Sequence, residues 1–316
     1  QTDKITLPPK YNLISGLYLL IIQLAVADFA LITTAIGPEL WSINMRTWSF
    51  GTGSCVAHRG LRVFTSTASL YLVTTIALHA LATVNLETKA AIQRNKRRDC
   101  DDDEEIRSSR HSLVASSDTS TPPRTMNVDY RLTDAIVPVA PPSIFVWVLS
   151  ASLSIPEFAL ATTVRTDRDT VICTLVDSNH NENMQSLLVM FNLFLPLSIM
   201  TTAAILIIFK LRSKKIRSQI EGSESVASLK LSLCLISVYC ALCSPQSIFN
   251  VYKIYSPTIN DVQLVNKNNS ILLVSMILNA ACLTALLIRP LLCVISIPDL
   301  RKLISFGFRT TDLNNV

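Results

Sequence analysis

Two ionisable residues stand inside otherwise apolar stretches of this 316-residue sequence, and they are the first candidates for chemistry. Asp28 lies in a stretch from Leu13 to Ile36, and Arg289 lies in a stretch from Ile271 to Ile297. A charge at the centre of a bilayer costs about 2.5–3.5 kcal/mol on insertion scales, so such a residue usually has a partner and a function. We therefore treat both residues as functional candidates whose partners have to be identified.

A second group of candidates stands near the ends of apolar stretches. Glu157 follows Pro156 at the expected outer end of its helix, where it either faces a ligand cavity or is exposed at the membrane interface. His79 is a lone histidine near the other interface, which is more typical of a structural role than of a pH switch. No nucleophile, base and orienting group occur as a set, so we do not expect an enzyme. With only 7 glycines and 4 histidines there is little material for phosphate-binding glycine loops or histidine metal clusters, so we expect neither a bound cofactor nor a metal.

The composition excludes several classes of function. Hydrophobic residues make up 49% of the chain and charged residues only 16%, which is the balance of a protein whose main solvent is lipid. The 28 basic and 23 acidic residues leave a net charge of +5, and much of both signs falls between residues 87 and 134. We therefore expect neither a soluble enzyme nor a nucleic-acid-binding protein.

The elements that position these residues are predicted to be membrane-spanning helices. A helix needs about 20 apolar residues to cross the hydrocarbon core, because backbone polar groups cannot stay unpaired in lipid. Six stretches qualify, so the sequence predicts an all-α membrane protein. They are Leu13 to Ile36, Val63 to Val84, Ser143 to Val164, Ser186 to Phe209, Leu231 to Tyr252 and Ile271 to Ile297.

The short loops give the expected orientation in the plasma membrane. The connection after Phe209 is rich in lysine and arginine, as is the connection after Val84, and basic loops stay in the cytoplasm. Residues 1–84 and 141–297 then hold the helices. Residues 85–140 form a long cytoplasmic loop that is too polar and Ser/Thr-rich to order itself, and 298–316 form a cytoplasmic amphipathic helix and tail.

The same topology places three further residues outside the cell. Cys55 and Cys173 fall at outer surfaces, where a disulfide persists, whereas the other cysteines lie within helices or in the cytoplasm. Asn268 begins an Asn-Asn-Ser glycosylation sequon on that side.

A series of motifs resembles the rhodopsin-like (class A) G-protein-coupled receptors. Their order and spacing cover nearly the whole chain, and the family's first helix is absent. We therefore expect a fragment of a seven-transmembrane-receptor-like bundle with six helices present; the alternative is a six-helix protein. The motifs are Leu24-Ala25-Val26-Ala27-Asp28, Trp48 to Gly51 with Cys55, Trp147 with Pro156, Cys173, Pro196, Pro245, and Arg289-Pro290 with Cys293, followed by the short helix Asp299 to Phe308.

The resemblance implies a disulfide and an internal polar site. Cys55 and Cys173 correspond to the family's conserved bridge. Asp28, Ser69 and Arg289 occupy positions that surround a sodium ion in the family, with asparagine at the last. A guanidinium brings its own positive charge, so we expect an Asp28–Arg289 ion pair in place of sodium. The alternative is that Arg289 reaches the cytoplasmic interface.

The chain departs from the family at the positions that switch its activity. His79-Ala80-Leu81 stands in place of the Asp-Arg-Tyr triplet, so the arginine that engages the G protein is missing. Cys243 replaces the tryptophan of the sixth helix, and Cys293 replaces the tyrosine of the seventh, although Pro245 and Pro290 are kept. These departures put ordinary G-protein coupling in doubt.

The resemblance also narrows the ligand. Arg62 stands where amine receptors carry an aspartate, and Leu283 stands where opsins carry the retinal lysine. We expect a peptide, a lipid or an anionic small molecule, with Arg62 and Glu157 in the ligand cavity. The function favoured is a receptor that relays an extracellular ligand to a heterotrimeric G protein or another cytoplasmic partner. The alternatives are a non-signalling scaffold or decayed receptor and, with less support, a transporter or channel.

Overall fold

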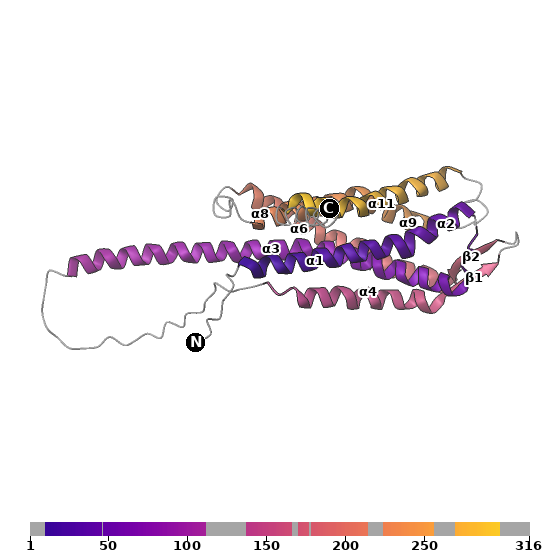
Figure 1. The fold of residues 1–316 in the computed structure, drawn as a ribbon, viewed down its shortest axis with the longest axis horizontal. Helices are drawn as coiled ribbons and strands as arrows, with labels where there is room; N and C mark the ends of the chain where they lie inside the picture. Colours follow the sequence, from indigo (N-terminus) through magenta and orange to yellow (C-terminus); the bar gives the residue numbers. More distant parts are fainter. Residues whose placement is uncertain are drawn as a thin grey trace, which may run out of the picture.

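A computed structural model describes residues 10–45, 47–111, 137–165, 170–176, 178–213, 224–255 and 269–297. These residues form an elongated helical bundle with a small sheet at one end (Figure 1). The helices are α1 (Lys10–Leu31), α2 (Gly37–Met45), α3 (Gly51–His111), α4 (Ala140–Leu160), α5 (Ser178–Val189), α6 (Leu195–Arg212), α8 (Glu224–Val238), α9 (Ser244–Tyr255) and α11 (Asn269–Ser296), with the π-helical turns η1 (Ile32–Ile36), η3 (Met190–Phe194) and η4 (Tyr239–Cys243) and the strands β1 (Ala161–Arg165) and β2 (Val171–Leu175).

Within the described residues, six helical segments are long and apolar enough to cross a membrane, which confirms the predicted fold class. Their outward faces carry large apolar side chains: Phe29 on α1 is 69% exposed and Phe145 on α4 is 60% exposed. Soluble proteins rarely expose apolar surface on this scale, whereas lipid solvates it. The segments are Gly16–Ser42, Gly51–Ile92, Ala140–Leu160, Asn183–Arg212, Ser225–Tyr252 and Leu273–Ser296.

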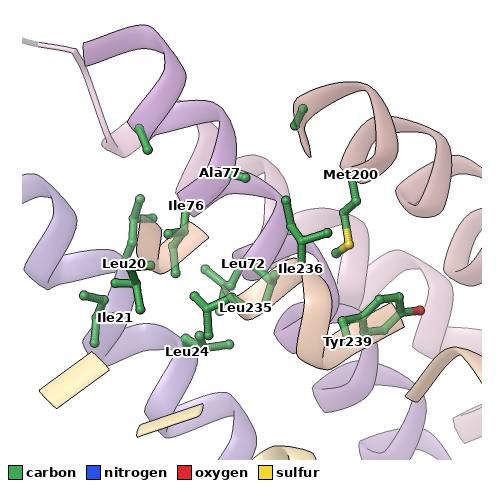
Figure 2. Close-up of a cluster of buried hydrophobic side chains, with 14 of the residues drawn as sticks. Leu20, Ile21, Leu24, Leu72, Ile76, Ala77, Met200, Leu235, Ile236 and Tyr239 are labelled. Atoms are coloured by element: carbon green, nitrogen blue, oxygen red, sulfur yellow. The ribbon is translucent and has the colours of Figure 1, made fainter. Parts of the chain in front are cut away.

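Helix α3 is the central element of the bundle. Within its most apolar window 89% of residues are buried, against less than half in each of the other five segments. It packs against α1, α4, α6 and α8, so almost every side chain along its membrane-spanning part meets another helix. Figure 2 shows the resulting core, in which Leu72 and Ile76 of α3 belong to the same cluster as Leu20 of α1, Leu235 of α8 and Met200 of α6.

Helix α3 also corrects one predicted boundary. The loop expected from residue 85 is wrong for residues 85–111, because the helix continues without a break to His111 and projects beyond the rest of the bundle (Figure 1). The sequence contains neither glycine nor proline between Gly60 and Pro122, and the stretch after Val84 is rich in good helix formers. Residues 112–136 of the expected loop, Asn268 and the helix expected after residue 298 lie outside the described residues.

The three π-helical turns have a common cause in the sequence. Each ends two residues before a proline, namely Pro38, Pro196 and Pro245. A proline ring collides with the carbonyl group four residues earlier and donates no backbone hydrogen bond, so a widened turn relieves the conflict. Pro156 and Pro290 instead lie inside the continuous helices α4 and α11.

A two-stranded antiparallel hairpin, β1–β2, caps one end of the bundle, which we call the hairpin end. Thr163 pairs with Cys173 in its register. The sequence placed Thr162 to Val164 at the end of a spanning helix, but α4 stops at Leu160. These β-branched residues favour a strand once the chain leaves the apolar bundle.

Candidate functional site

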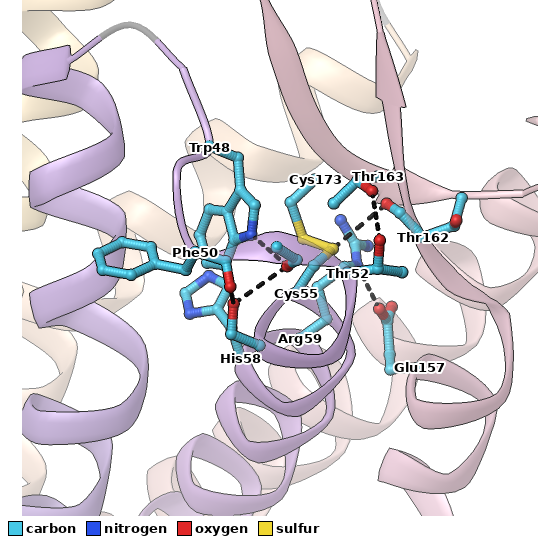
Figure 3. Close-up of a disulfide and its surroundings, with 12 residues drawn as sticks. Trp48, Phe50, Thr52, Cys55, His58, Arg59, Glu157, Thr162, Thr163 and Cys173 are labelled. Atoms are coloured by element: carbon cyan, nitrogen blue, oxygen red, sulfur yellow. Dashed lines mark hydrogen bonds and ion pairs between the residues drawn. A yellow bond between two sulfur atoms is a disulfide. The ribbon is translucent and has the colours of Figure 1, made fainter.

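The hairpin end is fixed to α3 by a disulfide. Cys55, fully buried in the second turn of α3, is bonded to Cys173 of β2 with 5.6 Å between their Cα atoms (Figure 3). Gly51 starts α3 with a φ of +82°, a conformation that glycine adopts without a side-chain penalty. The backbone N–H of Trp48 donates to the carbonyl oxygen of Val171 at 2.7 Å, so the segment before α3 is held to β2 as well.

A cavity of about 720 Å³ lies at this end, behind the hairpin. Its size falls within the roughly 300–1,000 Å³ typical of small-molecule and cofactor sites. Arg62 and Glu157, both expected to face a ligand cavity, line it together with Cys173 of the disulfide. α2, α3, α4, β2, α5, η3, α9 and α11 all contribute to the lining.

Two ion pairs stand in the wall of this cavity. Nε of Arg59 on α3 is 2.7 Å from Oε2 of Glu157 on α4, as Figure 3 shows. Nη1 of Arg62, one turn further along α3, is 2.7 Å from Oε2 of Glu39 on α2. Because each arginine is matched by a carboxylate, the cavity does not present an isolated positive charge to a ligand.

A second polar site lies deeper in the bundle and joins the three residues of the expected internal site. Nη1 of Arg289 on α11 is 3.0 Å from Oδ1 of Asp28 on α1 and donates to Oγ of Ser69 on α3 at 2.7 Å. The hydroxyl of Ser69 donates to the same carboxylate oxygen at 2.5 Å. All three side chains are buried, so Arg289 does not reach the membrane interface.

The Arg289–Asp28 ion pair is not bidentate, although a guanidinium and a carboxylate can form two parallel hydrogen bonds. One nitrogen of Arg289 meets one oxygen of Asp28, while Oδ2 of Asp28 and Nε of Arg289 are buried without a hydrogen-bond partner. Nη2 of Arg289 is turned instead toward the sulfur of Cys243 at 3.8 Å. Among the described residues no cluster of three or more histidine, cysteine or acidic side chains could hold a metal ion.

The remaining switch positions are packed into the core. His79, Ala80 and Leu81 are all buried on α3. The ring of His79 lies against α1 at Gly16, where an added Cβ would be 3.4 Å from it. None of these three residues is an arginine or a lysine, and none of them is exposed, so they present no positive charge on the surface of α3.

Two cysteines near the ion pair, Cys243 and Cys293, are also buried, and Cys282 is partly buried. Cys243 in η4 has its sulfur 3.3 Å from that of Cys282 on α11. Cys293 is buried on the next turns of α11, beyond Pro290, and Pro245 follows Cys243 at the start of α9. The two positions that hold aromatic side chains in the resembled family are thus filled here by small, apolar thiols.

Several residues of the cavity were missed by the sequence reasoning. Glu39 is the partner of Arg62, and its acidic side chain beside Pro38 in an apolar stretch was an available signal. Five amide side chains also line the cavity, and most of them are rare polar residues within apolar spans. They are Gln185, Asn192, Gln246, Asn250 and Asn279.

The described residues form a bundle of six apolar helices with a disulfide-tethered hairpin over a polar cavity, which is the architecture of a multi-pass membrane protein. Residues 136–283 match the family model described as 7 transmembrane receptor (rhodopsin family), so the chain is similar to that family over this range. The match covers just under half of the chain, from α4 into α11, and through the family it implies a receptor and not an enzyme. No protein in a search of curated proteins matches the chain.

Proposed function

We propose that this protein is a plasma-membrane receptor that binds an extracellular ligand in the cavity at the hairpin end. The observation that carries the proposal is the cavity itself, which is of ligand size and lined from eight elements whose relative positions a bound molecule would affect. We expect a peptide, a lipid or an anionic small molecule in preference to a monoamine, because Arg62 stands where amine receptors of the resembled family carry an aspartate. The acidic residues in its wall, Glu39 and Glu157, are already paired with arginines.

The orientation required by this proposal is supported by the distribution of charge. Lys210 and Arg212 lie in the last turn of α6, at the end of the bundle opposite the hairpin, and basic residues next to a span favour the cytoplasmic side. The Cys55–Cys173 disulfide suits an oxidising, extracellular environment at the hairpin end. The long end of α3 and the C-terminus then face the cytoplasm.

Signal relay would follow as a shift between helix arrangements that ligand binding stabilises unequally. The intracellular partner is a heterotrimeric G protein or another cytoplasmic protein. One observation favours a second candidate, a receptor-like protein that does not signal through G proteins. The buried His79, Ala80 and Leu81 offer no arginine to such a partner.

G-protein activation in cells separates the two candidates. The native chain and a variant carrying His79→Asp, Ala80→Arg and Leu81→Tyr would be exposed to pooled peptides and lipids at matched surface levels. A response from the native chain supports a receptor that couples without the arginine. A response from the variant alone means that the cavity senses ligand while the cytoplasmic face has lost its partner. Silence from both, with surface delivery verified, counts against the receptor proposal.

A further inference from the structure

The lining of the cavity is divided by chemistry. Among its described residues, every acidic or basic side chain comes from α2, α3 or α4, whereas every amide side chain comes from α5, η3, α9 or α11. The charged half holds two arginines, two glutamates and His58, and it is neutral overall when His58 is neutral. A ligand therefore meets paired charges on one side and neutral donors and acceptors on the other.

The two ion pairs differ in how readily a ligand can reach them. The side chains of Arg62 and Glu39 are 38% and 26% exposed, whereas those of Arg59 and Glu157 are 24% and 4% exposed. Next to Arg59, α3 approaches α4 closely, because an added Cβ on Gly60 would lie 2.4 Å from the ring of Phe158. The Arg59–Glu157 pair thus belongs to a tightly packed contact between α3 and α4. The more exposed Arg62–Glu39 pair is the one whose partners a ligand can displace.

A ligand that displaces one partner of the Arg62–Glu39 pair leaves the other partner without its counter-charge, and this limits the charge that the ligand can carry. A purely anionic ligand that takes Arg62 leaves the carboxylate of Glu39 unpaired beside a second negative charge, and a purely cationic ligand does the reverse to Arg62. Leaving one partner of a partly desolvated pair uncompensated is costly. A zwitterion avoids this cost because its carboxylate pairs with Arg62 while its ammonium group pairs with Glu39.

The amide half of the cavity complements peptide groups. Asn192 accepts a hydrogen bond from the hydroxyl of Thr67 at 3.0 Å, and Gln246 donates to Asn279. A carboxamide carries two N–H donors and an oxygen with two lone pairs, so one such bond leaves further capacity on each side chain. Peptide N–H and C=O groups match that capacity, whereas the tail of a lipid does not.

We infer that the cavity binds a short peptide with free termini. Its ammonium and carboxylate groups insert into the Arg62–Glu39 pair, and its amide groups face the side chains of α5, η3, α9 and α11. The volume of about 720 Å³ limits such a ligand to a few residues. This inference rests on the proposed receptor function and names the ligand class of the same cavity.

Affinity selection with the purified full chain in lipid nanodiscs tests the inference. The probes are pooled peptides of two to four residues in four forms: both termini free, N-acetylated, C-amidated, and blocked at both ends. Bound peptides are identified by mass spectrometry. We expect free-ended peptides to be enriched about tenfold over each singly blocked form, since one lost charge-assisted contact costs on the order of 1.4 kcal/mol.

Matched variants show whether the ion pair is responsible. Glu39→Gln should abolish the preference for a free amino terminus, and Arg62→Gln should abolish the preference for a free carboxylate. Arg212→Gln, which removes a charge at the opposite end of the bundle, should keep both preferences. Equal enrichment of N-acetylated peptides, enrichment of doubly blocked peptides, or no enrichment by a protein that unfolds cooperatively would each overturn the inference. This assay measures binding and does not depend on signalling. Peptide enrichment by a chain that activates no G protein in cells would therefore contradict the proposed signal relay and leave the peptide site intact. A cellular response to a lipid or a simple anion, without peptide enrichment, would support the proposed receptor function and contradict the inference that the ligand is a peptide.

Discussion

The buried contact between Arg289 and Asp28 leads to the most quantitative prediction. Replacing arginine by asparagine (Arg289→Asn) leaves a carboxylate that is only 4% exposed, with the hydroxyl of Ser69 as its one remaining described donor. Removing one partner of a buried ion pair costs about 3–5 kcal/mol, and an oxygen of Asp28 already lacks a partner before the change. We therefore expect Arg289→Asn and Asp28→Asn each to lower the free energy of unfolding by about 3 kcal/mol or more.

The double variant distinguishes an ion pair from two independent polar residues. With both charges removed, no uncompensated charge stays in the membrane, so the double variant should be less destabilised than the sum of the singles by about 2–3 kcal/mol. Denaturant unfolding in nanodiscs, followed by circular dichroism, gives all four corners of this cycle. Arg212→Gln serves as a control, because this exposed arginine at the end of α6 should leave stability unchanged.

Sodium provides an independent reading of the same site. In the native chain the guanidinium supplies the positive charge, so replacing choline chloride by sodium chloride at equal ionic strength should not change stability. In Arg289→Asn the lone carboxylate either admits sodium, which restores part of the lost stability, or leaves the fold permanently weakened. Unchanged stability in Arg289→Asn, with equal insensitivity to sodium before and after, would refute the account of this ion pair, as would additive losses in the cycle.

Two further predictions concern the hairpin end. Cys55→Ser and Cys173→Ser should each reduce delivery to the cell surface, because loss of a native disulfide typically costs about 2–5 kcal/mol. In surface labelling, the double variant should show no loss beyond that of either single variant. Additive losses would argue against a shared disulfide. Gly60→Ala should destabilise the chain by about 1–3 kcal/mol, since the added methyl group meets the ring of Phe158. In thermal unfolding, adding Phe158→Ala to that variant should recover part of the loss. A Gly60→Ala variant as stable as the native chain would show that α3 and α4 separate at this contact without cost.

The six spans could be predicted because each depends only on local composition. Length and apolar content decide whether a helix can cross a bilayer, whatever its neighbours are. The end of α3 could not be predicted in this way, because the polar composition after Val84 predicts disorder, whereas the residues there are good helix formers without a helix breaker and continue α3 to His111. The strand at Thr162 was missed because an apolar run gives no sign of where the bundle ends.

The candidate sites were predictable to different degrees. Asp28 and Arg289 are unusual in any apolar span, but their pairing across 261 residues of sequence needed the resemblance to a known family. Glu39 and the amide side chains were missed because a residue lines a cavity only if its helix is rotated toward it, and helix rotation is set by packing between helices. Asn250 and Ile248 stand two residues apart on α9, yet Asn250 lines the cavity while Ile248 is 54% exposed on the outside of the bundle.

That pair of residues provides the most direct test of the central claim, that ligand acts from the cavity at the hairpin end. The measurement is the cellular response to free-ended peptide pools of the native chain, of Asn250→Trp and of Ile248→Trp, at equal surface levels. Asn250→Trp fills the cavity with a large side chain, whereas Ile248→Trp adds the same side chain to the lipid-facing side of the same helix. The account predicts a response from the native chain and from Ile248→Trp, and none from Asn250→Trp. An undiminished response from Asn250→Trp would contradict it.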